Sequence, residues 1–108
     1  MLRVVITAPA ERDMQEQHDW WAQNRSTTQA ARWHRAFSQA IRSLSARPTR
    51  CGLAQENRRW PFEVRQLVFG LGRRPTHRAL FRIVGDQVVI LRTRHLAQAE
   101  LDVDDIDG

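Results

Sequence analysis

The stretch STTQAARWHRAFSQAIRSL, residues 26–44, decides how this chain folds. Its apolar side chains recur every three or four positions, which is the spacing of a helix that packs one face on a core. That face consists of Ala30, Trp33, Phe37, Ala40, Ile41 and Leu44. Ser26 with Gln29 three residues on is a capping box, and Pro48 prevents the helix from continuing. The stretch therefore predicts a core-facing helix.

The residues before this stretch predict a strand and another helix. Residues 2–7 are mostly apolar and β-branched, which suits a strand. Pro9 is tolerated at a helix start, and Glu11 and Asp13 in the first turn complement the helix dipole. This helix should end just before a turn at Arg25, which joins the two helices in a hairpin.

The residues after the hairpin predict a loop and then three strands. Residues 47–60 have no periodic pattern and favour a connecting loop. Strand-like segments follow at residues 62–69, 79–84 and 87–93, with a tight turn at residues 85–86. We expect an α+β fold, in which an N-terminal strand and a C-terminal three-strand meander form a mainly antiparallel sheet. The two-helix hairpin should pack on one face of that sheet and leave the other face open.

The composition indicates one globular domain with a basic body. A chain of 108 residues is expected to form one core. All 17 basic residues are arginine, and five of the twelve acids fall within residues 99–108, so residues 1–98 carry a formal charge of +10. We assign residues 1–98 to a single domain and residues 99–108 to an acidic tail. A basic body favours an anionic partner, the alternative being a genome-wide bias toward arginine.

Few residues suggest disulfide, membrane or metal chemistry. A single cysteine, Cys51, excludes an internal disulfide and fits a reducing cytoplasm. No stretch approaches the ~20 apolar residues of a membrane span. His18, His34 and His77 lack metal-ligand spacing, so we expect them to be structural or exposed. We expect no metal and no cofactor.

The arginines concentrate in the second half of the chain. Nine lie between residues 58 and 94, with only Glu63 and Asp86 among them to balance the charge. Strand periodicity turns Arg78 and Arg82 toward the same outer face. A row of guanidinium groups can hold phosphates or carboxylates, the alternative being a solvated face. The candidate binding residues are Arg58, Arg59, Trp60, Arg65, Arg73, Arg74, Arg82 and Arg92.

His95, at the end of the last predicted strand, is the best candidate for proton transfer, because an imidazole exchanges protons near neutral pH and arginine does not. Beside Arg78 and Arg94 it would suit an enzyme that cleaves RNA through the 2′-hydroxyl. The alternative is a strand-end histidine that bonds to backbone. For Trp60 the alternative to a binding role is core packing. For Arg65 it is an ion pair with Glu63.

The order and spacing of many residues resemble one family. They are Ala10, Asp13, residues 30–44, Pro48, Arg50, Cys51, Leu53, Ala54, residues 63–65, Leu67, Gly70, Arg78, residues 80–83, Val88, residues 90–92, Arg94 and His95. In these residues the chain resembles the RelE/ParE superfamily of bacterial toxins from type II toxin–antitoxin systems. The superfamily includes members described as plasmid stabilisation proteins.

The resemblance implies a cytoplasmic, growth-inhibiting toxin that a cognate antitoxin neutralises, with a toxin–antitoxin hetero-oligomer as one expected form. ParE-like members bind DNA gyrase and are not nucleases, whereas RelE-like members are endoribonucleases that cut messenger RNA on the ribosome. By position, Arg78, Arg94 and His95 resemble catalytic residues of the RelE type. The chain has no lysine and no tyrosine, and its long hairpin is ParE-like, so the resemblance favours gyrase binding. A third reading is a non-toxic, degenerate member that acts as a binding module.

Overall fold

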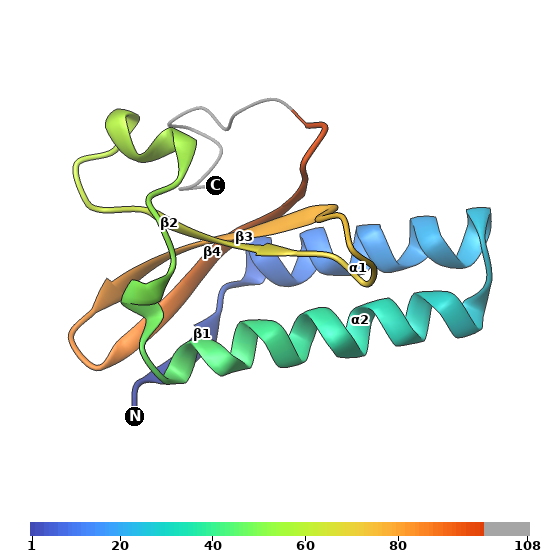
Figure 1. Cartoon of the computed structure of the whole chain (residues 1–108), viewed down its shortest axis with the longest axis horizontal. Coiled ribbons are helices and arrows are strands. Elements are labelled where there is room, and N and C mark those ends of the chain that lie inside the picture. Colours follow the sequence, from blue (N-terminus) through green and yellow to red (C-terminus); the bar gives the residue numbers. More distant parts are fainter. Residues whose placement is uncertain (99–108) are drawn as a thin grey trace.

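The computed structural model describes residues 1–98, which form a sheet with a helical hairpin on one side (Figure 1). In chain order the strands and α-helices are β1 (Arg3–Ile6), α1 (Ala8–Asn24), α2 (Thr27–Arg42), β2 (Arg65–Phe69), β3 (His77–Val84) and β4 (Gln87–His95). Short 3-10 helices between α2 and β2 are η1 (Ser43–Ser45), η2 (Pro48–Arg50) and η3 (Gln55–Arg59). The acidic tail predicted at residues 99–108 lies outside the described residues.

The helical hairpin forms where the sequence predicts it. α1 begins directly after Thr7, whose hydroxyl oxygen accepts the N–H of Ala10 at 3.3 Å. In the same way, the Ser26 hydroxyl accepts the Gln29 N–H at 3.0 Å and starts α2. Only Arg25 and Ser26 separate the helices, which therefore lie side by side (Figure 1). No helix within residues 1–98 is long and apolar enough to cross a membrane.

The strands form one mixed sheet in the order β1-β4-β3-β2. β1 runs parallel to β4, while β4, β3 and β2 are antiparallel neighbours. Gly85, whose φ is 58°, lies with Asp86 in the turn between β3 and β4, as predicted. β2 is shorter than the strand predicted at residues 62–69, because residues 62–64 belong to the preceding loop. The expected α+β architecture is confirmed.

β4 contains a bulge that changes its alternation. Phe81 of β3 pairs with Ile90, but the next β3 residue, Leu80, pairs with Arg92, so Leu91 has no partner on β3. The bulge therefore sets Arg92, rather than Leu91, opposite Leu80. It lies just beyond the point where β1 ends, since the β1 register stops at Ile90.

The main core lies between the hairpin and the sheet. The predicted face of the second helix is buried there, since Trp33, Phe37, Ile41 and Leu44 are inaccessible to solvent. Their partners from the sheet are Ala79, Phe81, Val88 and Ile90. Burial of these large apolar side chains is the main source of stability.

The face of the sheet away from the hairpin is not open, which corrects the prediction. Residues 54–64 cross it (Figure 1), and a second apolar cluster forms beneath them from Ala54, Trp60, Val64, Leu80 and Leu91. Trp60, predicted as a binding residue, is only 8% exposed and belongs to this cluster. The apolar residues of the segment follow no helix or strand period, which is why a sequence pattern shows only a loop.

The turn after β2 requires glycine at its first position. A Cβ built on Gly70 lies 2.2 Å from the Arg74 carbonyl oxygen and 2.9 Å from the Cα of Pro75, whereas one on Gly72 meets nothing within 4 Å. We expect Gly70→Ala to lower the free energy of unfolding by roughly 1–3 kcal/mol, because the backbone must move. The control Gly72→Ala should change it by less than about 0.5 kcal/mol. Urea denaturation followed by circular dichroism checks both, and equal stabilities would contradict the expectation.

Candidate functional site

The arginines of the second half do not form one continuous exposed surface. Arg58 and Arg59 in η3 are exposed, as are Arg73 and Arg74 in the loop after β2, but the two pairs lie at opposite ends of that strand. The others are partly or fully buried: Arg65, Arg78, Arg82, Arg92 and Arg94. The prediction of a single outward row of guanidinium groups is therefore wrong. The roles of these residues in binding stay predictions.

Arg78 is the clearest departure from the expected surface. Its guanidinium donates two hydrogen bonds to the carboxylate of Glu56, NH2 to Oε2 at 2.6 Å and NH1 to Oε1 at 2.7 Å. NH1 also donates to the side-chain oxygen of Gln66 at 3.1 Å. Arg78 is 3% exposed and Glu56 0% exposed, so this is a buried bidentate ion pair.

Sequence reasoning missed Glu56 because it lies two residues before the first arginine of the run and in a segment without periodicity. η3 carries Glu56 over β3 and so brings it to a partner 22 positions away. The one available signal was that Glu56 is the lone acid of the segment from residue 47 to residue 60. An isolated acid in a basic loop is a candidate for a buried partner of one of the arginines.

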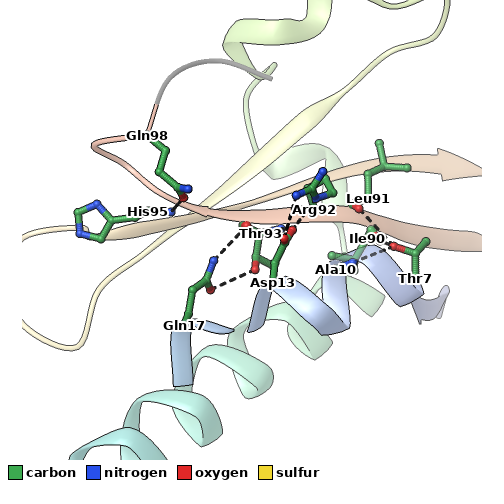
Figure 2. A network of polar contacts seen from close by, with 10 residues as sticks. All are labelled: Thr7, Ala10, Asp13, Gln17, Ile90, Leu91, Arg92, Thr93, His95 and Gln98. Atoms are coloured by element: carbon green, nitrogen blue, oxygen red, sulfur yellow. Dashed lines mark hydrogen bonds and ion pairs between the residues drawn. The ribbon is translucent and has the colours of Figure 1, made fainter. Parts of the chain in front are cut away.

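Arg92 also has an acidic partner within the chain. Its guanidinium donates to both carboxylate oxygens of Asp13 on α1, Nε to Oδ2 at 2.6 Å and NH2 to Oδ1 at 2.9 Å (Figure 2). The backbone N–H of Thr93 donates to the same Oδ2 at 3.1 Å. Asp13 was expected only to complement the helix dipole, but it binds α1 to the bulged part of β4.

α1 takes the place of a neighbouring strand along the second half of β4. β1 ends at Ile6, and from there on the side chains of α1 and of its cap satisfy the edge of β4 (Figure 2). The Thr7 hydroxyl donates to the Ile90 carbonyl oxygen at 2.7 Å, and the Gln17 amide donates to that of Thr93 at 3.1 Å. The edge of β4 is therefore closed to backbone pairing at these positions.

Arg94 completes a cluster of three arginines with Arg78 and Arg92, which we call the arginine cluster. Arg94 pairs directly with Arg78 in the register of β3 and β4, and Arg92 lies two residues away on β4. Burial lowers the pKa of Arg94, and the charges of Arg92 and Arg78 lower it further. Asp13 and Glu56 act in the opposite direction and balance part of this charge.

His95 ends β4, and its ring is exposed. Its Nδ1 accepts the backbone N–H of Ala97 at 3.0 Å, and its own backbone N–H donates to the side-chain oxygen of Gln98 at 2.8 Å (Figure 2). A ring whose Nδ1 accepts a hydrogen bond carries its proton on Nε2. The structure therefore matches the backbone-bonded alternative, with Nε2 directed away from that bond.

His77 is structural, as predicted. It is buried, and its ring lies against those of Trp33 at 4.9 Å and His95 at 5.1 Å between centroids. Its Nδ1 is 2.7 Å from the Thr76 hydroxyl. Burial, and after it the nearby His95, lowers the pKa of His77 to about 4. The ring is thus neutral at pH 7.

Two further arginines have local structural partners. Arg65 donates from Nε to Glu63 at 2.8 Å, which is the ion pair expected from the sequence, and from NH1 to the carbonyl oxygen of Cys51. The guanidinium carbon of Arg82 lies 3.8 Å from the ring centroid of Phe62, a cation–π contact. Both side chains hold the segment that crosses the outer face.

A cavity of about 490 Å³ lies between α1 and the end of β4. Trp20 and Trp21 contribute to it from the C-terminal part of α1, Arg25 from the turn after that helix, and Arg94 and His95 from the strand. We call it the α1–β4 cavity. It brings together two of the three residues predicted for catalysis, but not Arg78. Within residues 1–98 no group of three or more metal-ligating side chains is placed to hold an ion.

This architecture has been seen before in a toxin–antitoxin context. A solved structure described as the chromosomal ParDE TA system from P. aeruginosa matches with a TM-score of 0.74 at 21% sequence identity, covering 88% of this chain and 96% of that chain. At this identity the likeness establishes the class of fold, a small α+β domain with a helical hairpin on a mixed sheet. No curated protein matches the sequence significantly.

Comparison of the sequence with family models identifies the family. A family model described as the ParE toxin of the type II toxin-antitoxin system parDE matches residues 4–100. The chain belongs to this ParE toxin family. The resemblance to the RelE/ParE superfamily drawn from the sequence is thereby confirmed.

Breaking the Glu56–Arg78 pair should strongly destabilise the fold. Glu56→Gln removes the carboxylate charge and leaves the Arg78 guanidinium buried without its counter-charge, so we expect the free energy of unfolding to fall by about 3–5 kcal/mol. The exposed pair offers a matched control, since Glu63→Gln should cost less than about 1 kcal/mol. Urea denaturation measures both variants. An equal decrease in the free energy of unfolding in both variants would show that the buried pair matters no more than the exposed one.

His77 should make stability depend on pH. The unfolded chain binds a proton on this ring near pH 6.5 and the folded chain only near pH 4, so stability is present above the upper value and lost as the pH falls through this window. From pH 7 to pH 5 the free energy of unfolding should decrease by about 2 kcal/mol. The pKa of His34 is lowered as well, by burial and by His18, and acts with the same sign. Denaturation at both pH values checks this. In His77→Gln the free energy of unfolding should change much less between pH 7 and pH 5. An equally large change in the variant would show that other groups cause it.

Proposed function

We propose that the chain is the growth-inhibiting toxin of a type II toxin–antitoxin pair, that a cognate antitoxin neutralises it by binding, and that it acts by binding DNA gyrase rather than by catalysing a reaction. Membership of the ParE toxin family supports the first part. The observation that carries the last part is the burial of Arg78 in its bidentate pair with Glu56. A RelE-like nuclease would need this guanidinium at the scissile phosphate.

The remaining groups are also poorly suited to RNA cleavage. Cleavage through the 2′-hydroxyl needs a group that transfers protons, placed beside accessible cations. His95 is the only candidate among the residues proposed for catalysis, and its Nδ1 already bonds to the backbone N–H of Ala97. The arginines around it stabilise charge but do not exchange protons. This chemistry favours binding of a target over catalysis.

The exposed arginines are the residues that we propose for binding. Arg58 and Arg59 lie in η3, and Arg73 and Arg74 in the loop after β2, where their guanidinium groups can contact an acidic surface of the target or of the antitoxin.

The proposed location is the cytoplasm. The chain has a single thiol, that of Cys51, and burial raises its pKa. A raised pKa keeps the thiol protonated and so less reactive.

The RelE-like alternative keeps one specific support, which is that Arg94 and His95 line the same α1–β4 cavity. An RNA phosphate held there would meet a cation and an imidazole Nε2. This alternative assigns catalysis to His95 and cation roles to the arginine cluster, so it makes a different prediction for a His95 variant.

The test is a plasmid supercoiling assay with purified gyrase. We expect the protein to block supercoiling when in excess and to lose this effect when the antitoxin encoded beside it is added. His95→Ala should inhibit gyrase and arrest growth like the parent chain, because no proton transfer is involved. Arg73→Gln with Arg74→Gln should weaken inhibition, because the charge of one exposed loop is removed.

Two outcomes would count against this proposal. Unaffected supercoiling at a large excess of protein would remove gyrase as the target. Loss of growth arrest in His95→Ala, together with transcript cleavage by the parent chain and not by the variant, would favour the RelE-like endoribonuclease.

A further inference from the structure

The α1–β4 cavity has features of a small-molecule site that gyrase binding does not use. Its volume of about 490 Å³ falls within the range of pockets that hold small ligands. It has one aromatic wall, from α1, and one cationic end, from β4 and the turn after α1.

The aromatic wall consists of two tryptophans held at right angles. Trp20 and Trp21 lie with ring centroids 5.6 Å apart and planes at 90°. Trp20 is 52% exposed, so part of its indole ring is accessible to a ligand. An indole that a neighbouring ring fixes in place offers a flat surface for stacking, and every nucleobase has a face that stacks on it.

The cationic end is formed by Arg25 and Arg94, and His95 lines the cavity as well. Arg25 is exposed directly after α1, and no carboxylate of residues 1–98 forms an ion pair with it. The acids of the cavity are Asp13, which is engaged by Arg92, and Glu16. Guanidinium forks suit phosphate, and the Nε2–H of His95 adds a further donor.

The contacts along β4 favour a compact ligand over a peptide. An added strand would need open backbone groups at the edge of the sheet. The Thr93 N–H donates to Asp13, the Thr93 carbonyl oxygen accepts from Gln17, and the His95 N–H donates to Gln98 (Figure 2). The edge facing the cavity is thus satisfied from within the chain.

We propose that the α1–β4 cavity binds a nucleotide, with the base stacked on Trp20 and the phosphate held by Arg25 and Arg94. The ligand is a nucleoside monophosphate unit, which either a free nucleotide or the end of a single strand can supply. The base and the phosphate then each contribute to the binding free energy. A nucleoside or a free phosphate should therefore bind more weakly than the nucleotide.

The indole N–H signals in an ¹⁵N-correlated NMR spectrum test this, because each tryptophan gives one signal. Trp60 does not line the cavity and serves as an internal reference. We expect AMP to shift the Trp20 and Trp21 signals with a Kd below about 1 mM, and adenosine or inorganic phosphate to bind at least about fivefold more weakly. The Trp60 signal should stay in place. Tighter binding of a short oligoadenylate than of AMP would identify the end of a strand as the source, and equal binding the free nucleotide.

Variants separate the two halves of the site. Trp20→Ala should weaken AMP and adenosine alike, whereas Arg25→Gln should weaken AMP by roughly threefold or more and leave adenosine unchanged. Arg35→Gln, an exposed arginine on α2 outside the cavity, is the matched control. Equal affinity for AMP and phosphate, equal shifts at Trp60, or equal binding of an acidic hexapeptide that carries no base would each overturn the proposal. Gyrase inhibition is read separately, so either proposal can fail alone.

Discussion

The bidentate pair between Glu56 and Arg78 holds the outer face of the sheet together. Either charge alone would be too costly to bury, but the fork of the guanidinium matches both carboxylate oxygens, and Gln66 adds a further acceptor. With this pair in place, residues 54–64 can lie on the sheet and cover Leu80 and Leu91 with their own apolar side chains. The same pair removes from the surface Arg78, the arginine that by position resembles a catalytic residue of the RelE type.

A second carboxylate links the hairpin to the sheet. β1 is too short to cover β4, and where it stops, the first turns of α1 supply Asp13 and Gln17 as acceptor and donor for the strand edge. Asp13 also neutralises Arg92, so one side chain satisfies both the backbone and a charge. The arginine cluster is thus held from two directions, by a helix on one side and by a loop on the other.

The sequence predicted what depends on local periodicity and missed what depends on distant pairing. The stripe from Trp33 to Leu44, the turn at Arg25 and the hairpin turn at Gly85 follow rules that act over a few residues, and the structure has them. The order and spacing of residue types along the chain were enough to identify the family. Arg78 and Arg92 are held by partners 22 and 79 positions away, and no sequence period reports such a contact. Burial of Trp60 rests on irregular backbone, which has no periodic signature.

The parallel pairing of β1 with β4 determines when, during synthesis, the sheet can form. Val4 lies beside Val88, so the first strand has no neighbour in the sheet until more than eighty further residues have been synthesised. Contacts of such long sequence separation slow folding, and during translation they delay it until the last strand has left the ribosome. The helical hairpin, whose contacts are local, can form well before then. Until then the nascent chain carries its first strand without a partner in the sheet.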